Sequence, residues 1–280
     1  MTALTIRAAM QRQPLPEIES RILLAYALGV DHAYLIAHAC DPLDDEAHAR
    51  FDSLCRRRLA GVPVAYLTGI REFYGLPFSV APAVLIPRPE TELLVDLALE
   101  RIPYDRVVRV LDLGTGSGCV ALAIAKNCPL ARVTATDVSA GSLAIARENA
   151  ERLEIDLEFR QSDWYAGLGV ERFDLIVANP PYVAAGDPHL AVGDLRFEPN
   201  TALTDGSDGL ASIEAIVAGA PAHLAARGWL LFEHGYDQAA AARERLAAAG
   251  FDLIRSWRDL AGIERVSGGQ LRNEFIGSDA

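Results

Sequence analysis

The spacing of apolar residues divides the chain into regions of different periodicity. Through residue 68 the apolar positions recur at helical intervals, and no strand-like run interrupts them. Helices are expected from Pro16-Glu17 to Gly29, from Asp31 onward, and from about Asp44 to Leu59, each with a suitable start or stop residue. Residues 1–68 are therefore predicted to form a small helical bundle.

A strand-like pattern follows. In residues 69–84, apolar and aromatic residues surround Gly75 and Pro77, which predicts a short hairpin that links two domains. Residues 85–280 are predicted to form the second domain, in which Glu90 or Thr91 opens a helix and strands then alternate with helices. The expected strands are 107–111, 132–136, 157–161, 173–178, 229–233 and 251–257. Repeated βα units predict an α/β, Rossmann-like fold with a mainly parallel sheet and with ligands at the carboxyl ends of the strands.

Composition and charge narrow the classes of function. With 51% hydrophobic and 23% charged residues, the 280-residue chain is expected to form a soluble globule, and it has no run of about 20 apolar residues for a membrane helix. Its first residues lack the layout of a secretion signal, so we expect a cytoplasmic protein, and a monomer. The net charge of −12 argues against direct nucleic-acid binding. The cysteines are too widely spaced for a metal site, so no metal is expected: Cys40, Cys55, Cys119 and Cys128.

A glycine-rich turn follows the first strand of the second domain. Gly114-Thr115-Gly116-Ser117-Gly118 lets the backbone turn sharply and approach a ligand closely. A dinucleotide-binding turn would place its third glycine one position later, where this chain has Cys119. Asp112 stands just before the turn, where its carboxylate suits a positively charged ligand better than a pyrophosphate.

Acidic residues recur at the ends of the next two strands. Asp137 ends the second strand, where a carboxylate can accept hydrogen bonds from ribose hydroxyls. Asp163 and Trp164 end the third strand, where an acid can bind an exocyclic amine and an aromatic ring can cover an adenine face. Each residue alone could be a helix cap or a core residue. Together they predict a site for an adenosyl cofactor.

Asn179-Pro180-Pro181-Tyr182 follows the buried strand 173–178 and is the most specific motif in the chain. A planar amide nitrogen is a poor nucleophile because its lone pair is delocalised. The Asn179 side-chain oxygen and the Pro180 carbonyl can each accept one of its N–H bonds, which orients the nitrogen and stabilises the charge that develops on it. The prolines make the turn rigid, and the Tyr182 ring can lie against a flat substrate near the cofactor sulfonium. Asn-Pro and Pro-Pro also occur in ordinary turns, but this position at a strand end predicts transfer of a methyl group to nitrogen.

At these residues the chain resembles the HemK/PrmC family, whose members methylate the glutamine of the Gly-Gly-Gln loop in class I peptide-chain release factors. The resemblance covers nearly the whole chain and extends beyond the motifs above to Phe73-Tyr74-Gly75, to 86–92 and to 187–190, 196–199 and 259–262. It implies a class I methyltransferase domain that uses S-adenosylmethionine, preceded by a helical domain that binds the release factor. A sister group that methylates a glutamine of a large-subunit ribosomal protein shares the Asn-Pro-Pro-Tyr motif but differs in the segment after Pro87-Arg88.

The resemblance also assigns roles to individual residues. It implies that Gly114, Gly116, Asp137, Trp164 and Asn179 contact the cofactor. It implies further that the substrate glutamine is held by Asn179, Pro180, Pro181 and Tyr182, and that Phe73 and Arg88 line the site between the domains. The tail from Leu271 to Ala280 lies outside the resemblance.

Other readings of the sequence remain open at this point. The same tetrapeptide would suit adenine N6 in DNA or RNA, although the net charge opposes nucleic-acid binding. A nicotinamide-dependent oxidoreductase would require a different glycine spacing, and a noncatalytic adenosyl-binding adaptor would not need the Asn179 motif. We interpret Gly268-Gly269-Gln270 as a turn, His234 as a structural residue, and Arg56-Arg57-Arg58 as a solvated helix face.

Overall fold

The structure is a computed structural model that describes residues 4–272, so most of the tail from Leu271 onward lies outside the described residues. The chain forms two compact units. The first contains the chain up to Ile70 together with Ala191–Phe197, and the second contains the rest of the chain from Arg71 onward.

The first unit is helical, and its cap residues explain where the helices begin and end. The Asp31 and Asp44 side chains accept backbone N–H bonds at 2.7 Å from Tyr34 and Ala47, and Gly29 ends a helix in the left-handed region with φ 68°. The expected helices are thereby confirmed. Two short helices at the ends of this unit were not predicted, since each spans less than two turns. The helices are α1 (Ile6–Gln11), α2 (Glu17–Leu28), α3 (His32–Ala37), α4 (Asp45–Leu59) and α5 (Val64–Thr68).

An ion-pair network joins the segment Ala191–Phe197 to α2 and α4 within the first unit. The Arg58 guanidinium donates two hydrogen bonds of 2.8 Å to the carboxylate of Glu19 and a third of 2.8 Å to Asp194. The interpretation of the three arginines as a solvated face is therefore wrong for Arg58. The ion-pair network could not be predicted, because Asp194 lies far from Arg58 in the sequence.

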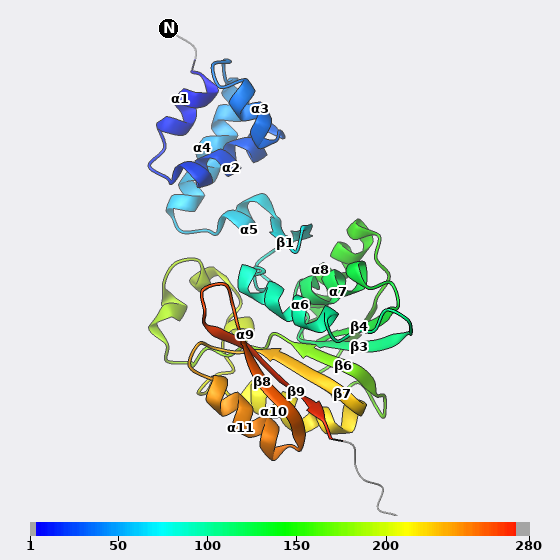
Figure 1. The fold of residues 1–280 in the computed structure, drawn as a ribbon. Helices are drawn as coiled ribbons and strands as arrows, with labels where there is room; N and C mark the ends of the chain where they lie inside the picture. Colours follow the sequence, from blue (N-terminus) through cyan, green and yellow to red (C-terminus); the bar gives the residue numbers. More distant parts are fainter. Residues whose placement is uncertain (1–3, 273–280) are drawn as a thin grey trace, which may run out of the picture. The chain divides into compact units, whose positions relative to one another are not determined.

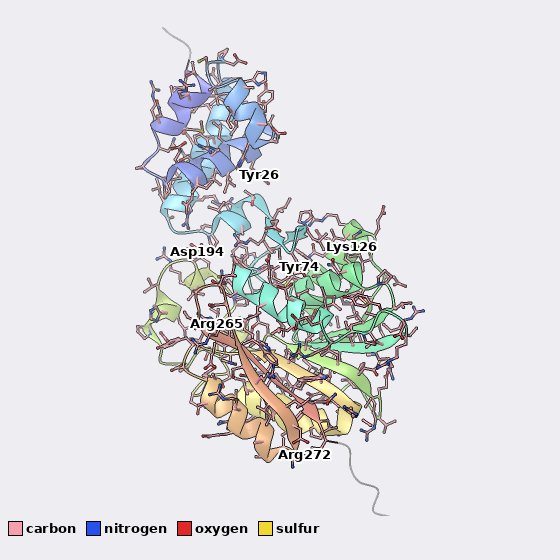
Figure 2. All side chains as sticks on the ribbon, in the orientation of Figure 1. Tyr26, Tyr74, Lys126, Asp194, Arg265 and Arg272 are labelled. Atoms are coloured by element: carbon pink, nitrogen blue, oxygen red, sulfur yellow. The ribbon has the colours of Figure 1, made fainter. Side chains whose placement is uncertain are left out.

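The predicted hairpin is present and begins the second unit. Strands β1 (Ile70–Phe73) and β2 (Leu76–Ser79) pair through a turn in which Tyr74 and Gly75 both have positive φ. Figure 2 labels Tyr74, whose hydroxyl donates a 2.7 Å hydrogen bond to Asp96. Phe73 is only 1% exposed and packs edge-on against Phe78, so its ring belongs to the core.

The rest of the second unit is a seven-stranded sheet in the order β5-β4-β3-β6-β7-β9-β8. Its strands are β3 (Val108–Leu113), β4 (Ala131–Asp137), β5 (Glu158–Gln161), β6 (Phe173–Ala178), β7 (Leu224–Glu233), β8 (Phe251–Arg258) and β9 (Glu264–Leu271). Its helices are α6 (Glu92–Leu99), α7 (Cys119–Asn127), α8 (Ala140–Leu153), α9 (Asn200–Leu203), α10 (Ala211–His223) and α11 (Ala239–Ala248). Single 3-10 turns are η1 (Pro89–Thr91) and η2 (Pro188–Ala191), and a third, η3 (Leu195–Phe197), belongs to the first unit. Strands β3 to β7 pair in parallel, which confirms the predicted α/β fold with a mainly parallel sheet.

Alternate residues of the central strands face two separate apolar cores. Val108 and Val110 of β3 pack with α6 and α7 on one face, whereas Leu111 and Leu113 pack with α10 and α11 on the other. Figure 1 shows these helix pairs on the two sides of the sheet. Strands β4 and β5 are added to the sheet on one side of β3, and β6 and β7 on the other. Because the order of the strands reverses between the parallel neighbours β3 and β6, a crevice for a ligand is expected at their carboxyl ends.

Strand β9, which lies between β7 and β8 and pairs antiparallel with both, was not predicted. Gly268 and Gly269 lie within β9 and pair with Leu231 and Leu230 of β7, so the interpretation of Gly268-Gly269-Gln270 as a turn is wrong. A Cβ at Gly268 would lie 2.3 Å from the Leu230 carbonyl oxygen, so the close approach of the strands requires glycine at this position. In the described part of the chain, no helix is long and apolar enough to cross a membrane.

Candidate active site and cofactor pocket

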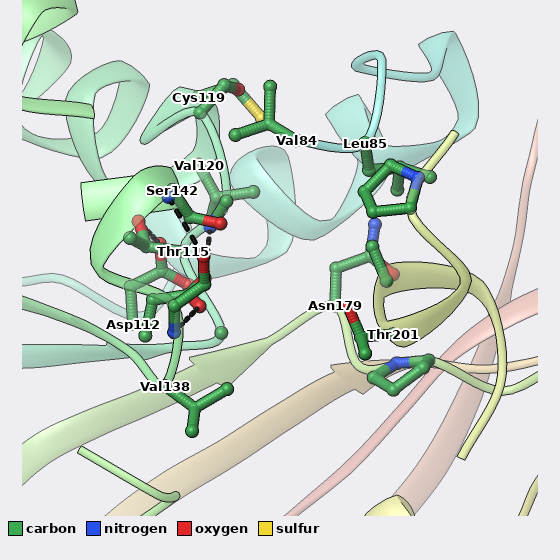
Figure 3. Close-up of a pocket in the computed structure, with 18 of the residues that line it drawn as sticks. Val84, Leu85, Asp112, Thr115, Cys119, Val120, Val138, Ser142, Asn179 and Thr201 are labelled. Carbon is green, nitrogen blue, oxygen red and sulfur yellow. Dashed lines mark hydrogen bonds between the residues drawn. The ribbon is translucent and has the colours of Figure 1, made fainter. Parts of the chain in front are cut away.

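A pocket opens at the carboxyl ends of β3, β4 and β6, where the sequence placed its candidate residues. It encloses about 1060 Å³ of empty space, counted out to its open mouth. Figure 3 shows Asn179 on the opposite side of this pocket from Asp112 and Thr115. The predicted residues that line it are Arg88, Asp112, Gly114, Thr115, Gly116, Ser117, Asp137, Asp163, Trp164, Asn179 and Pro181.

The glycine turn between β3 and α7 is shaped by left-handed backbone at Gly114, Gly116 and Gly118. Its ends are fixed because the Thr115 backbone N–H donates to Thr136 O, and that of Gly118 to Thr115 O, both at 2.8 Å. Gly118 is also crowded, since a Cβ there would lie 3.2 Å from the Cβ of Ala146. It therefore holds the turn against α8 but is not among the residues that line the pocket.

Asp112 lies inside β3 rather than after it, and it is 2% exposed. Its Oδ2 accepts a 2.6 Å hydrogen bond from the Thr115 hydroxyl. The pKa of Asp112 is raised to about 7, mainly by burial; the Thr115 hydrogen bond lowers it, and the nearby charge of Asp137 acts in the same direction as burial. A buried acid beside another acid is a site that a positively charged ligand would stabilise.

Asp137 ends β4 and is held by the backbone of two turns. Its Oδ2 accepts from the Gly116 backbone N–H at 2.9 Å, and its Oδ1 from that of Ser139 at 2.8 Å. Burial raises the pKa of this carboxyl, while these hydrogen bonds lower it. The remaining lone pairs can accept hydrogen bonds from ligand hydroxyls.

Trp164 stands in a tight turn after β5, in the left-handed region with φ 45°. The Ser162 hydroxyl donates a 2.8 Å hydrogen bond to the Trp164 carbonyl and accepts another from the Gly167 backbone N–H at 2.8 Å. This strained conformation places Trp164 and Asp163 on the pocket wall. An aromatic wall next to an acid suits a heterocycle that carries an amine.

Asn179 follows the last residue of β6, and its side-chain amide is oriented by a hydrogen bond. Nδ2 donates to the Thr91 hydroxyl at 3.1 Å. The other end of the amide, Oδ1, is then the group available to accept an N–H bond from a ligand.

Tyr182, the last residue of the Asn-Pro-Pro-Tyr motif, is fixed by hydrogen bonds of its side chain and its backbone. The Tyr182 hydroxyl donates to Oε1 of Glu233 at 3.0 Å, and the Tyr182 carbonyl accepts from the Gln238 side chain at 3.0 Å. Burial raises the pKa of Tyr182 well above its usual range, and the adjacent carboxyl of Glu233 adds to this. Neither Tyr182 nor the buried Pro180 is among the residues that line the pocket.

A buried carboxylate joins two walls of the pocket. Both oxygens of Glu198 are used, one by the Arg88 guanidinium and the other by the Ile86 backbone N–H at 3.0 Å. The Glu198 side chain is fully buried, whereas that of Arg88 is 29% exposed and lines the pocket. The pair therefore holds a cationic group at the wall.

The structure thus brings most of the predicted site residues together at the pocket. Gly118, Pro180 and Tyr182 are next in sequence to residues that line it, whereas the Phe73 ring lies in the apolar core and not on the pocket wall. No role in the pocket was assigned from the sequence to the other wall residues. They are Ala83, Val84, Leu85, Pro87, Thr91, Cys119, Val120, Val138, Ser139, Ser142, Ser162, Pro199, Thr201 and Ala202. His234 is fully buried between the Gly235 carbonyl and the Ser267 hydroxyl, at 2.8 Å from each, which agrees with a structural role. In the described range, no group of three or more His, Cys, Asp or Glu side chains could hold a metal ion.

Comparisons with known proteins agree with this geometry. Residues 5–69 match the model of the PrmC N-terminal domain, and residues 90–206 match that of the methyltransferase small domain. The release factor glutamine methyltransferase of Burkholderia pseudomallei is 54% identical over 275 residues, which cover 95% of this chain and 96% of that protein. That of Neisseria gonorrhoeae is 50% identical and covers 91% of this chain and 94% of its own length.

A solved structure shows the same fold. A methyltransferase from Pyrococcus furiosus matches with a TM-score of 0.55 and 21% identity, over 78% of this chain and 97% of that one. The resemblance identified from the sequence motifs is confirmed by the curated relatives over almost the full chain. The chain belongs to the family of release factor glutamine methyltransferases.

Proposed function

We propose that this protein transfers a methyl group from S-adenosylmethionine to the side-chain amide nitrogen of the glutamine in the Gly-Gly-Gln loop of class I release factors. The relatives that cover almost the whole chain carry this activity in their names. The observation that carries the proposal is Asn179, whose amide is oriented by Thr91 at the wall of an acidic pocket.

The pocket residues fit the cofactor. S-adenosylmethionine, when bound, supplies an electrophilic methyl group on a positively charged sulfur. Asp112 and Asp137 place buried carboxyls where a ligand with cationic groups and ribose hydroxyls can bind them. Trp164 and Val138 supply apolar surface for an adenine ring, and Asp163 supplies an acceptor for its amine.

Asn179 and Pro180 act on the substrate amide. Oδ1 of Asn179 and the Pro180 carbonyl each accept one N–H bond, which holds the nitrogen in place and stabilises the positive charge that grows on it. The nitrogen becomes more acidic as it is alkylated, so its proton can leave without a strong base. Pro181 and Tyr182 keep the turn rigid, and Arg88, which lines the pocket, can contact the protein substrate.

We further propose that the helical first unit binds the body of the release factor, that the protein acts as a monomer in the cytoplasm, and that it binds no nucleic acid directly. The net charge of −12 suits a basic protein partner better than a phosphate backbone.

A methyl-transfer assay tests the proposal. Purified unmethylated release factor is incubated with S-adenosylmethionine labelled in its methyl group, using the wild-type enzyme, Asn179→Ala and the matched control Asn127→Ala. Asn127 is exposed, and its side chain bonds only within α7. Label is expected with wild type and Asn127→Ala and is expected to be lost with Asn179→Ala or with a release factor whose loop glutamine is replaced. Label that persists on the release factor without that glutamine contradicts the proposal.

A further inference from the structure

The side chain of Gln238 makes three hydrogen bonds to backbone groups, one of which belongs to the last residue of the Asn-Pro-Pro-Tyr motif. Its Oε1 accepts from the Gly235 backbone N–H at 2.8 Å. Its Nε2 donates to the Tyr182 carbonyl at 3.0 Å and to the Gly209 carbonyl at 3.1 Å. These partners fix the orientation of the side-chain amide, because only its NH₂ end can donate to two carbonyls and only its oxygen can accept from a backbone N–H.

The backbone of Gln238 is itself held in place. Gln238 directly precedes α11, its backbone N–H donates to the Gly235 carbonyl at 3.1 Å, and its carbonyl accepts from the Ala242 backbone N–H at 2.9 Å. Gly235 follows shortly after the end of β7. Gln238 therefore connects the start of α11 and the end of β7 to the last residue of the motif.

The third partner, Gly209, lies in a segment that also supports the pocket. This segment follows residues 201–202, which line the pocket wall. Val183, the first residue after the motif, donates its backbone N–H to the Leu203 carbonyl at 2.9 Å. Gln238 thus joins the motif to a second wall of the pocket.

Gly209 and the Tyr182 carbonyl approach each other too closely for a side chain at residue 209. A Cβ at Gly209 would lie 2.3 Å from the Tyr182 carbonyl oxygen and 3.0 Å from Nε2 of Gln238. Such close approach of two backbone segments requires glycine. Gly209 and Gln238 together therefore set the position of the Tyr182 carbonyl.

A displacement of this carbonyl would move residues that line the pocket. Because Pro180 and Pro181 have fixed φ, the turn from Asn179 to Tyr182 moves as a unit. Asn179 and Pro181 belong to this turn and line the pocket. A shift of about 1 Å in a group that positions the reacting atoms can lower a rate about a hundredfold.

We propose that Gln238 is a positioning residue for methyl transfer, which holds the turn from Asn179 to Tyr182 in its place at the pocket wall. Gln238 is not among the residues that line the pocket, so it acts through the backbone of the motif. This inference rests on the proposed function for its kinetic consequence, but the environment of Asn179 can be measured without substrate.

Two substitutions of similar length test the two ends of the Gln238 side chain. Gln238→Met removes all three hydrogen bonds. Gln238→Glu keeps an oxygen for the Gly235 N–H but places a second oxygen opposite two carbonyl oxygens. Gln270→Met and Gln270→Glu are the matched controls, since Nε2 of Gln270 also donates to a backbone carbonyl, that of Arg227, at 2.8 Å. Gln270 pairs with Trp229, four residues before the end of β7 that lies at the pocket.

Kinetics with saturating S-adenosylmethionine and unmethylated release factor supply the first readout. Both Gln238 variants should lower kcat by roughly tenfold to a hundredfold, because the displaced turn no longer holds the reacting nitrogen correctly. The dissociation constant of the cofactor, measured by calorimetry, should stay the same. A residue that only stabilises the fold would lower the temperature of thermal unfolding and leave the kcat of the folded enzyme unchanged. The Gln270 variants should keep the wild-type kcat.

Gly209→Ala displaces the same carbonyl from a different residue, so kcat should fall as it does in Gln238→Met. Gly206→Ala is its matched control in the same segment. Gly206 has φ +78°, close to the +85° of Gly209, but among the described residues nothing lies within 4 Å of its Cβ position. It therefore measures the backbone strain alone, and equal kcat values in the two glycine variants would overturn the inference.

Nuclear magnetic resonance measures the motif without substrate. The chain has only five asparagines, so selective ¹⁵N labelling gives few side-chain signals, and Asn179→Ala identifies those of Asn179. We expect the Asn179 side-chain signals to shift in Gln238→Met and to keep their wild-type positions in Gln270→Met.

The outcomes separate this inference from the proposed function. Unchanged Asn179 signals in Gln238→Met overturn the inference, and so does a wild-type kcat in Gln238→Glu. A wild-type enzyme that is inactive on release factors, but whose Asn179 signals shift in Gln238→Met, overturns the proposed function and leaves the positioning role in place.

Discussion

Cofactor affinity should depend on pH through Asp112. Burial raises the pKa of Asp112 to about 7 in the protein without ligand, whereas the usual value is 3.8. A ligand with a positive charge favours the ionised form, so binding must release the proton wherever Asp112 is protonated. Affinity should therefore rise with pH up to about 7 and then level off.

The size of the effect follows from the ionised fraction. With a pKa of about 7, roughly 9% of Asp112 is ionised at pH 6 and roughly 76% at pH 7.5, so the dissociation constant should fall by about eightfold between these values. The stability of the free protein changes in the opposite direction. Because the folded pKa lies above the unfolded value, the folded state holds this proton more tightly, and stability falls as pH rises from about 4 to about 7. At pH 8 the penalty amounts to about 4 kcal/mol as an upper value.

Calorimetric titration with S-adenosylmethionine, which carries the positive sulfonium, at pH 6 and pH 7.5 measures the first effect, and chemical denaturation without ligand measures the second. Asp112→Asn should bind weakly with little dependence on pH and should be more stable than the wild type at pH 8. Asp137, whose pKa is also raised by burial, is retained in this variant and cannot account for a lost pH dependence. Equal wild-type affinity at the two pH values, or the same slope in Asp112→Asn, would refute the reasoning.

Other substitutions test the framework of the pocket. Gly118→Ala should lower the free energy of unfolding by about 1–3 kcal/mol, because φ is +82° and the new Cβ would crowd α8. The control Gly250→Ala measures the backbone strain alone, since Gly250 has φ +84° and open space around it. An equal loss of stability at both sites would show that crowding at Gly118 is unimportant. Glu198→Gln should destabilise the protein by about 1–3 kcal/mol in denaturant unfolding, because it weakens a fully buried acceptor of Arg88 and of the Ile86 backbone. Glu214→Gln, which breaks an exposed pair with Arg245, should cost less than about 1 kcal/mol, and a larger loss there than at Glu198 would contradict the account.

The site residues at the strand ends could be predicted because each is marked by the residues next to it in the sequence. The acid before the glycine turn, the acid that ends β4 and the motif after β6 are each adjacent in the sequence to the element that positions them. Parallel strands then bring them to one edge of the sheet, so most of the pocket follows from the order of the elements.

The parts that could not be predicted depend on contacts between distant segments. Glu198 belongs to the site because it accepts a hydrogen bond from Arg88, and Glu233 because it accepts one from Tyr182. Neither hydrogen bond can be predicted from the residues that are adjacent in the sequence. Strand β9 carries Gly268-Gly269, whose composition is typical of turns, and it is a strand because β7 approaches it too closely for side chains. The position of Asp112 within β3, and hence its burial, also required the pairing of that strand with β4.

The most direct test of the account is a peptide mass map of a class I release factor after incubation with this enzyme and S-adenosylmethionine. The account predicts one added methyl group on the peptide that contains the Gly-Gly-Gln loop, located on the glutamine side chain and absent when the enzyme carries Asn179→Ala. A methyl group on another residue, or an unmodified loop peptide with an enzyme that binds the cofactor, would contradict it.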